Sequence, residues 1–175
     1  MTAAGEAQAT AVAEILAQKE PTHLITSTYR RAVETTRIIG QVCQLVPETY
    51  PAFEELHRPR YLVGTRMLGW TTITYILRWF YNDVSASMHD GETYTSLLNR
   101  LDTARTHLEE LPADSRVIVV SHSVYINFFI AHCRRPQQMG FLRAGVTFAK
   151  ILLLKNSSVT HLRYTEAQGW KVVHH

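Results

Sequence analysis

A polar triplet, Ser121-His122-Ser123, directly follows the β-branched run Val117–Val120. Such an uninterrupted apolar run indicates a strand that is covered on both faces of a parallel sheet. The triplet then lies at the carboxyl end of this strand, where open α/β sheets bind ligands, and beside the amino terminus of the next helix, which favours anions. The segment predicts an α/β enzyme that handles phosphate. The alternative is that His122 is a core histidine with its polar atoms satisfied.

Arg31 lies at a second strand-to-helix turn, in the segment Ser27-Thr-Tyr-Arg-Arg-Ala-Val-Glu-Thr-Thr. Ser27 can cap the helix there, while the guanidinium of Arg31 faces the mouth of the site. The planar fork of an arginine holds two phosphate oxygens at once. Taken alone, the segment fits a solvated arginine on a helix face equally well.

Two adjacent carboxylates stand in the segment Phe53-Glu54-Glu55-Leu56-His57-Arg58-Pro59. A carboxyl group beside a phosphate can keep a proton and deliver it to a departing alkoxide. Two acidic residues next to two basic ones are also typical of weak surface ion pairs. Neither Ser121 nor Ser123 has a glycine two residues away on either side, and this excludes the nucleophile turn of a serine hydrolase.

Strands and helices alternate along the chain, which predicts a three-layer α/β/α sandwich with a mostly parallel sheet in a single domain, 1–175. Residues 66–93 are expected to form a helical excursion that serves as a lid. The patterns predict helices over 2–18, 29–45, 70–81 and 94–111 and directly after His122, and strands over 23–27, 117–120, 147–154, 159–164 and 170–173.

The excursion carries an aromatic stretch with two possible uses. Its rings could pack on the sheet while the other face shapes the substrate pocket, and this is the interpretation that we favour. They could instead form a partner-binding surface of an interaction module. The residues are Trp70, Tyr75, Trp79, Phe80 and Tyr81.

The composition is that of an ordinary globular protein, with 46% hydrophobic and 19% charged residues in 175. A net charge of +3 suits a small anionic substrate and is too weak to argue for nucleic acid. Cys43 and Cys133 have no metal-ligand spacing and are expected to be free buried thiols. No secretory signal or membrane span is recognisable, so we expect a cytoplasmic protein with no membrane association.

Five segments, in order, resemble motifs of the histidine phosphatase superfamily, also called the phosphoglycerate mutase-like family. Residues 1–9 are similar to its Leu-Thr-x-x-Gly-x-x-Gln-Ala helix opening, and residues 27–36 to its Ser-Pro-Leu-x-Arg-Ala-x-Gln-Thr-Ala segment. Phe53-Glu-Glu resembles Leu-x-Glu, Gly91-Glu-Thr resembles Gly-Glu-Ser, and Val119-Val-Ser-His-Ser resembles Val-Val-Ser-His-Gly. The resemblance covers nearly the whole chain.

The resemblance implies a phosphomonoester hydrolase that works through a phosphohistidine, without metal or other cofactor. It implies that His122 stabilises the transferring phosphoryl group, Arg31 clamps its oxygens and Glu55 donates a proton to the leaving group. Substrate binding is assigned to Arg31, Ser27, Ser123 and Arg58. The expected partner is a small phosphorylated substrate or phosphate, and a homo-oligomer is possible.

The family's first strand, which ends in the Arg-His-Gly motif of the nucleophilic histidine, has no counterpart in this sequence. None of the remaining histidines is expected to replace it. The fold is therefore expected to be phosphoglycerate mutase-like with its first strand missing, incomplete at the N-terminus and also at the C-terminus. We favour a part of a working phosphatase over a short form that binds phosphorylated ligands or a partner without catalysis. In either case we expect no turnover by these 175 residues.

Overall fold

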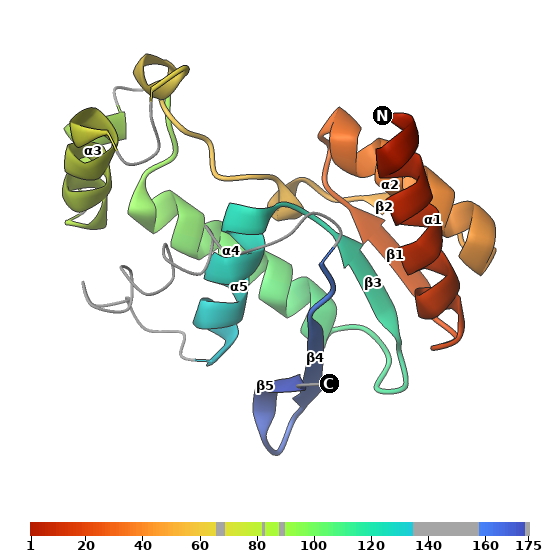
Figure 1. Cartoon of the computed structure of the whole chain (residues 1–175). Coiled ribbons are helices and arrows are strands. Elements are labelled where there is room, and N and C mark those ends of the chain that lie inside the picture. The colour runs from red at the N-terminus through yellow and green to blue at the C-terminus, as the bar shows by residue number, and fades with distance from the viewer. Residues whose placement is uncertain (66–68, 82, 88–89, 135–157, 174–175) are drawn as a thin grey trace.

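A computed structural model of the chain describes residues 1–65, 69–81, 83–87, 90–134 and 158–173 (Figure 1). Five α-helices, five strands and three short 3₁₀ turns are found in these residues. In chain order they are α1 Ala3–Ala17, β1 His23–Thr26, α2 Arg30–Cys43, β2 Glu48–Thr49, η1 Pro51–Phe53, η2 Arg60–Leu62, α3 Trp70–Phe80, η3 Val84–Ser87, α4 Tyr94–Glu109, β3 Val117–Val120, α5 Ser123–Arg134, β4 His161–Thr165 and β5 Gly169–Val173.

The central sheet is parallel and has the described strand order β2-β1-β3. Ile25 of β1 stands opposite Glu48 on one side and Val119 on the other. The pairing continues past the strand ends, where the amide of Ser27 donates to the carbonyl of Val120 at 3.1 Å. The segments that follow β1 and β3 therefore emerge side by side at one edge of the sheet.

Helices cover both faces of this sheet, which confirms the predicted α/β fold (Figure 1). Successive side chains of a strand point to opposite faces. Ile25 accordingly packs in the cluster that holds Leu97 of α4 and Phe128 of α5. Its neighbour Leu24 packs in a second cluster with residues of α1 and α2. The alternating contacts of one strand thus produce the three layers.

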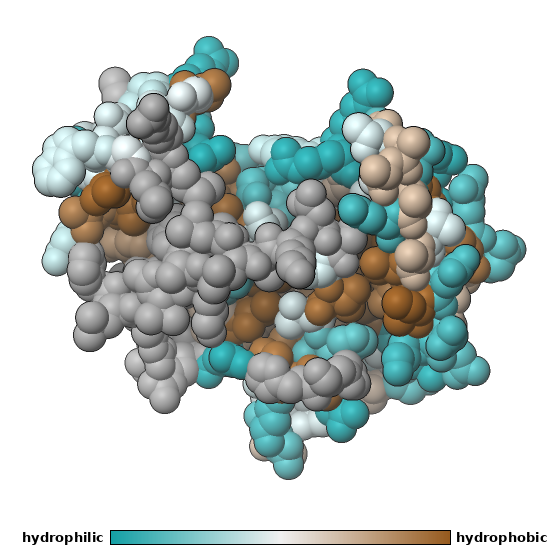
Figure 2. Space-filling model, in the orientation of Figure 1, coloured by the Kyte–Doolittle hydropathy of each residue, from teal (hydrophilic) through white to brown (hydrophobic). Residues whose placement is uncertain are grey.

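Strand β3 is less buried than its sequence predicts. Val117 and Val119 pack with the α4 and α5 cluster, whereas Ile118 and Val120 pack with α1 and α2. All four side chains stay half-buried, because β3 is the outer strand of the sheet in the described part of the chain. Figure 2 accordingly shows apolar surface in the region of β3.

The helix boundaries predicted for α1, α2, α3 and α4 are confirmed to within two residues. The hydroxyl of Thr2 accepts from the amide of Gly5 and caps α1, and Thr93 caps α4 by accepting from Ser96. The two-residue strand β2 was not predicted. The helix expected directly after His122 is α5. None of the described helices is both long and apolar enough to cross a bilayer.

The excursion helix α3 packs with one face, whereas its first residue and the residue that follows it are exposed. Trp79 is 1% exposed and its ring contacts Tyr94 of α4 and Phe128 of α5 at centroid distances of 5.1 and 5.8 Å. The rings therefore pack on these two helices, and not on the sheet as expected. Trp70, at 80% exposure, and Tyr81 remain on the surface.

The end of the described chain is an antiparallel hairpin of β4 and β5, in which His161 pairs with Val173. Trp170 of β5 packs edge-on against Phe129 of α5, so the hairpin rests on that helix. Both predicted strands are confirmed, with starts that differ by one or two residues. The strand predicted over 147–154 lies outside the described residues.

Candidate functional site

His122 occupies the carboxyl edge of the sheet, between the end of β3 and the start of α5, and is only 5% exposed. Its Nδ1 lies 2.9 Å from Nε of Arg31, and its Nε2 lies 2.7 Å from Oγ of Ser27. Because an arginine Nε can only donate, Nδ1 is the acceptor. The ring is therefore assigned the tautomer that carries its hydrogen on Nε2 and donates it to Ser27.

The imidazole of His122 is uncharged at neutral pH. Burial, and then the positive charge of Arg31, lower its pKa from 6.5 to about 4, and the carboxylate of Glu54 only partly opposes this. The site thus combines a permanent cation with a neutral ring that can accept a proton when an anion arrives.

Arg31 supplies the cation from the first turn of α2, where its side chain is exposed. One terminal nitrogen lies 4.0 Å from Oε2 of Glu55. Its guanidinium carbon lies 5.3 Å from the centre of the Tyr29 ring. The Nε of Arg31 donates to His122, whereas its two terminal nitrogens make no hydrogen bond within the described part of the chain. These nitrogens can therefore donate to a bound anion.

Glu55 is held at the amino end of α5. Its Oε1 accepts from the amide of Tyr125 and from the amide of Leu56, each at 3.0 Å. One carboxylate oxygen is thereby fixed by the chain, and the other is directed towards Arg31. The structure brings together the three residues to which catalysis was assigned: Arg31, Glu55 and His122.

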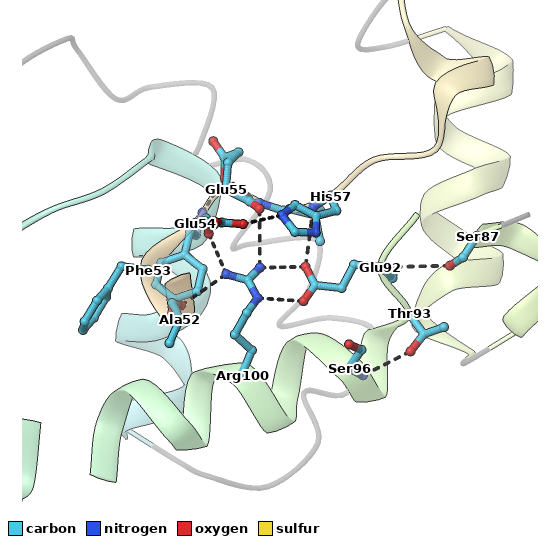
Figure 3. Close-up of polar contacts among 12 residues, drawn as sticks. Ala52, Phe53, Glu54, Glu55, His57, Ser87, Glu92, Thr93, Ser96 and Arg100 are labelled. Atoms are coloured by element: carbon cyan, nitrogen blue, oxygen red, sulfur yellow. Dashed lines mark hydrogen bonds and ion pairs between the residues drawn. The ribbon is translucent and has the colours of Figure 1, made fainter. Parts of the chain in front are cut away.

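A buried ion pair supports the segment that carries Glu55 (Figure 3). Arg100 of α4 donates from Nε and a terminal nitrogen to the two carboxylate oxygens of Glu92, at 2.8 and 2.7 Å. The same guanidinium donates to the carbonyls of Ala52, Glu54 and Glu55. Since each of these bonds satisfies a backbone acceptor of one short segment, Arg100 fixes that segment against α4.

A second group of side chains forms the rim of the site. Glu54 accepts from the hydroxyl of Thr28, and its other oxygen lies 2.9 Å from Nε2 of His57. The rings of His57 and Tyr29 are nearly parallel, at 11°, with centroids 6.3 Å apart. Tyr29 is also 5.1 Å from the ring of His122. These rim residues were not predicted, because only the tertiary structure brings residues 28–29 next to 54–57.

The substrate-binding residues assigned from the sequence differ in their contacts: Arg31 and Ser27 both meet the ring of His122, whereas Ser123 and Arg58 do not. Ser27 is fully buried beneath His122, so its hydroxyl orients the imidazole. It does not cap α2, whose N-cap residue is Tyr29. Ser123 begins α5 and is exposed, as is Arg58, and no described hydrogen bond or ion pair joins either one to Arg31 or His122.

The sequence predicted Glu92 only as part of a helix opening and Arg100 only as part of the helix that follows. Their eight-residue separation gave no signal for the pair, since Glu92 precedes the first turn of α4. Among the described residues, no three His, Cys, Asp or Glu side chains gather as metal ligands would.

The chain is similar in sequence to a known protein family and to named bacterial proteins. A family model described as "Histidine phosphatase superfamily (branch 1)" matches residues 1–175. The Yersinia enterocolitica protein named "Probable phosphoglycerate mutase GpmB" is 28% identical over 180 residues, which cover 98% of this chain and 79% of that protein.

Solved structures share the fold. The alpha-ribazole phosphatase from Shigella flexneri superposes with a TM-score of 0.71 at 18% identity, covering 99% of this chain and 83% of that one. A mycobacterial glucosyl-3-phosphoglycerate phosphatase in complex with inorganic phosphate gives a TM-score of 0.70 at 21% identity, covering 99% and 85%.

Proposed function

The chain belongs to the histidine phosphatase superfamily, and on that basis we propose that it is a phosphomonoester hydrolase whose phosphoryl group binds between Arg31 and His122. The contact that carries the proposal is the 2.9 Å bond from Nε of Arg31 to Nδ1 of His122. It holds an exposed, fork-shaped cation over a buried, neutral imidazole at the carboxyl edge of a parallel sheet. Similar phosphatases include one solved with inorganic phosphate.

Phosphate binding rearranges this contact in a defined way. Oxygens of the phosphoryl group accept the hydrogen bonds of Arg31, so Nδ1 of His122 no longer accepts one from that arginine. The dianion raises the pKa of the imidazole, because an opposite charge favours the protonated ring. Protonated at Nδ1, His122 then donates a hydrogen bond to the phosphoryl group and stabilises its charge.

Glu55 is the proposed proton donor. Its Oε1 is held by two backbone amides, so Oε2, which faces Arg31, is the atom that carries the proton. The proton passes to the leaving oxygen as the bond between that oxygen and phosphorus breaks. We propose hydrolysis in preference to mutase chemistry, since transfer to water needs no second set of residues that reposition the product.

The phosphoryl group must be taken up by a nucleophilic histidine, and we propose that this histidine is not one of these 175 residues. Of the described histidines, His122 is the one that contacts Arg31. His23 begins β1 and so lies at the opposite edge of the sheet, and His57 is bound to Glu54. His107 stacks on Tyr50, and His132 pairs with Asp102. His161 begins β4 in the terminal hairpin.

Two measurements test the proposal. Titration calorimetry with inorganic phosphate should show binding that Arg31→Ala weakens by a factor of about 10 or more. Failure of the unsubstituted chain to bind phosphate would overturn the phosphoryl site. Incubation with p-nitrophenyl phosphate should give neither turnover nor acid-labile phosphohistidine. A burst of phosphohistidine would retain the phosphatase and refute the claim that the nucleophile is absent.

The alternative, a module that binds phosphorylated ligands without turnover, makes the same binding prediction. Reading the gene in frame upstream of the Met1 codon separates the two functions. A strand that ends in Arg-His-Gly supports the hydrolase, and the extended protein should then hydrolyse phosphomonoesters. A stop codon without that motif supports the binding module.

A further inference from the structure

The rings of Tyr29 and His57 lie beside the proposed phosphoryl position, so a leaving group on the side of Glu54 would meet them. Tyr29 follows β1 directly, and its ring is 5.1 Å from that of His122 and 5.3 Å from the guanidinium carbon of Arg31. It therefore borders the phosphoryl position itself. The planes of Tyr29 and His57 differ by only 11°, so a planar group that packs along one ring is also parallel to the other.

The ring of His57 is held in place before any ligand binds. Nε2 of His57 lies 2.9 Å from the carboxylate of Glu54, which also accepts from the hydroxyl of Thr28. His57 nevertheless remains exposed, and Tyr29 is half-buried. A preorganised aromatic surface loses little conformational entropy on binding a ligand, and this is a general source of selectivity.

The carboxylate of Glu54 disfavours an anionic group beside the rings of Tyr29 and His57. The carboxylate of Glu54 acts electrostatically on both His122 and Tyr29. The pKa of Tyr29 is raised, first by burial and then by Glu54. Two nearby arginines are paired, Arg30 with Glu34 and Arg100 with Glu92. Arg58, which is exposed and follows His57 directly, is the described arginine of this segment that could offset Glu54. A carboxylate carried by the substrate would meet Glu54 there.

We propose that Tyr29 and His57 select phosphomonoesters with a planar, uncharged leaving group, such as aryl or heteroaryl phosphates, over alkyl phosphates and carboxylated phosphates such as phosphoglycerate. The inference rests on the phosphoryl site proposed above and names its substrate class. Stacking of a ring on aromatic side chains strengthens binding by a factor of about 2 to 10 beyond the area buried.

The test compares phenyl phosphate, methyl phosphate and 3-phosphoglycerate by titration calorimetry on the full 175-residue chain. Phenyl phosphate should bind about 5- to 10-fold more tightly than methyl phosphate, and 3-phosphoglycerate more weakly than either. Tyr29→Leu and His57→Ala should each bring the phenyl-to-methyl ratio close to one. Tyr29→Phe, which keeps the ring, should preserve it.

Tyr81→Leu is the matched control, since Tyr81 is an exposed tyrosine on the far excursion and its loss should leave the ratio unchanged. A ratio near one in the unsubstituted chain would overturn the aryl selectivity, as would a ratio that survives Tyr29→Leu in a protein with unchanged circular dichroism. If inorganic phosphate binds through Arg31 in that case, the phosphoryl site still stands. If inorganic phosphate also fails to bind, both proposals fall.

Discussion

Arg100 and Glu92 form a two-bond ion pair that ties three parts of the chain together (Figure 3). The guanidinium reaches the backbone of the segment that carries Glu55. The carbonyl of Glu92, in turn, accepts from the indole of Trp79 in α3 and from the hydroxyl of Ser87. The pair therefore couples the excursion to the proposed proton donor through one buried junction.

Removal of either partner of this pair should be costly. Arg100→Ala or Glu92→Gln leaves its partner buried without a counter-charge, and we expect a loss of about 3–5 kcal/mol in the free energy of unfolding. The double variant Arg100→Ala/Glu92→Gln should lose less than the sum of the two single variants. Urea denaturation measures all three. Arg60→Ala, which removes an exposed arginine 4.0 Å from Asp90, is the matched control with an expected change near zero.

The depressed pKa of His122 should make stability depend on acidity. The folded-state pKa, about 4, lies below the unfolded value of 6.5. Between these two pH values the unfolded chain binds a proton that the folded protein does not, so stability falls as the pH drops from 6.5 towards 4. The loss is on the order of 2–3 kcal/mol. The free energy of unfolding of His122→Gln should change less with pH over this window than that of the unsubstituted protein. Equal pH dependence in both proteins would contradict the assignment of the lowered pKa to His122.

Anion binding should be linked to proton uptake at His122. Sulfate resembles a phosphoryl group but does not itself titrate between pH 5 and 7, so any proton taken up belongs to the protein. Calorimetry in two buffers of different ionisation enthalpy should show uptake near pH 6, because the bound dianion raises the pKa of the imidazole. His122→Gln should bind sulfate without uptake. Arg31→Ala should weaken binding by a factor of about 10 or more, as expected for lost charged hydrogen bonds.

The aromatic excursion offers a comparison within a single helix. Trp79→Ala removes a fully buried ring and its hydrogen bond to Glu92, and should cost about 3–5 kcal/mol. Trp70→Ala removes a ring that is 80% exposed at the other end of α3, and should change stability by less than about 0.5 kcal/mol. Thermal unfolding distinguishes them. Unchanged stability in Trp79→Ala together with altered ligand affinity would favour the partner-binding interpretation.

The sequence by itself determined the elements and the edge of the sheet at which the site lies. Helix periodicity and the caps Thr2 and Thr93 are local, since they depend on residues within one or two turns. The parallel alternation of strand and helix then brings the segments after β1 and β3 to one edge, and so places Arg31 beside His122. The strand β2 was missed because two residues carry no periodicity.

Only the tertiary structure decided how the site is held and what surrounds it. The tautomer of His122 follows from which atoms of Ser27 and Arg31 meet its ring, and no spacing along the chain contains that information. Arg100 reaches carbonyls that are 45 to 48 residues away, and the rim pairs residues about 26 to 28 apart. Hydrogen bonds and ring contacts of this kind depend on ångström-scale distances between packed elements, which the amino-acid pattern specifies only through the complete fold.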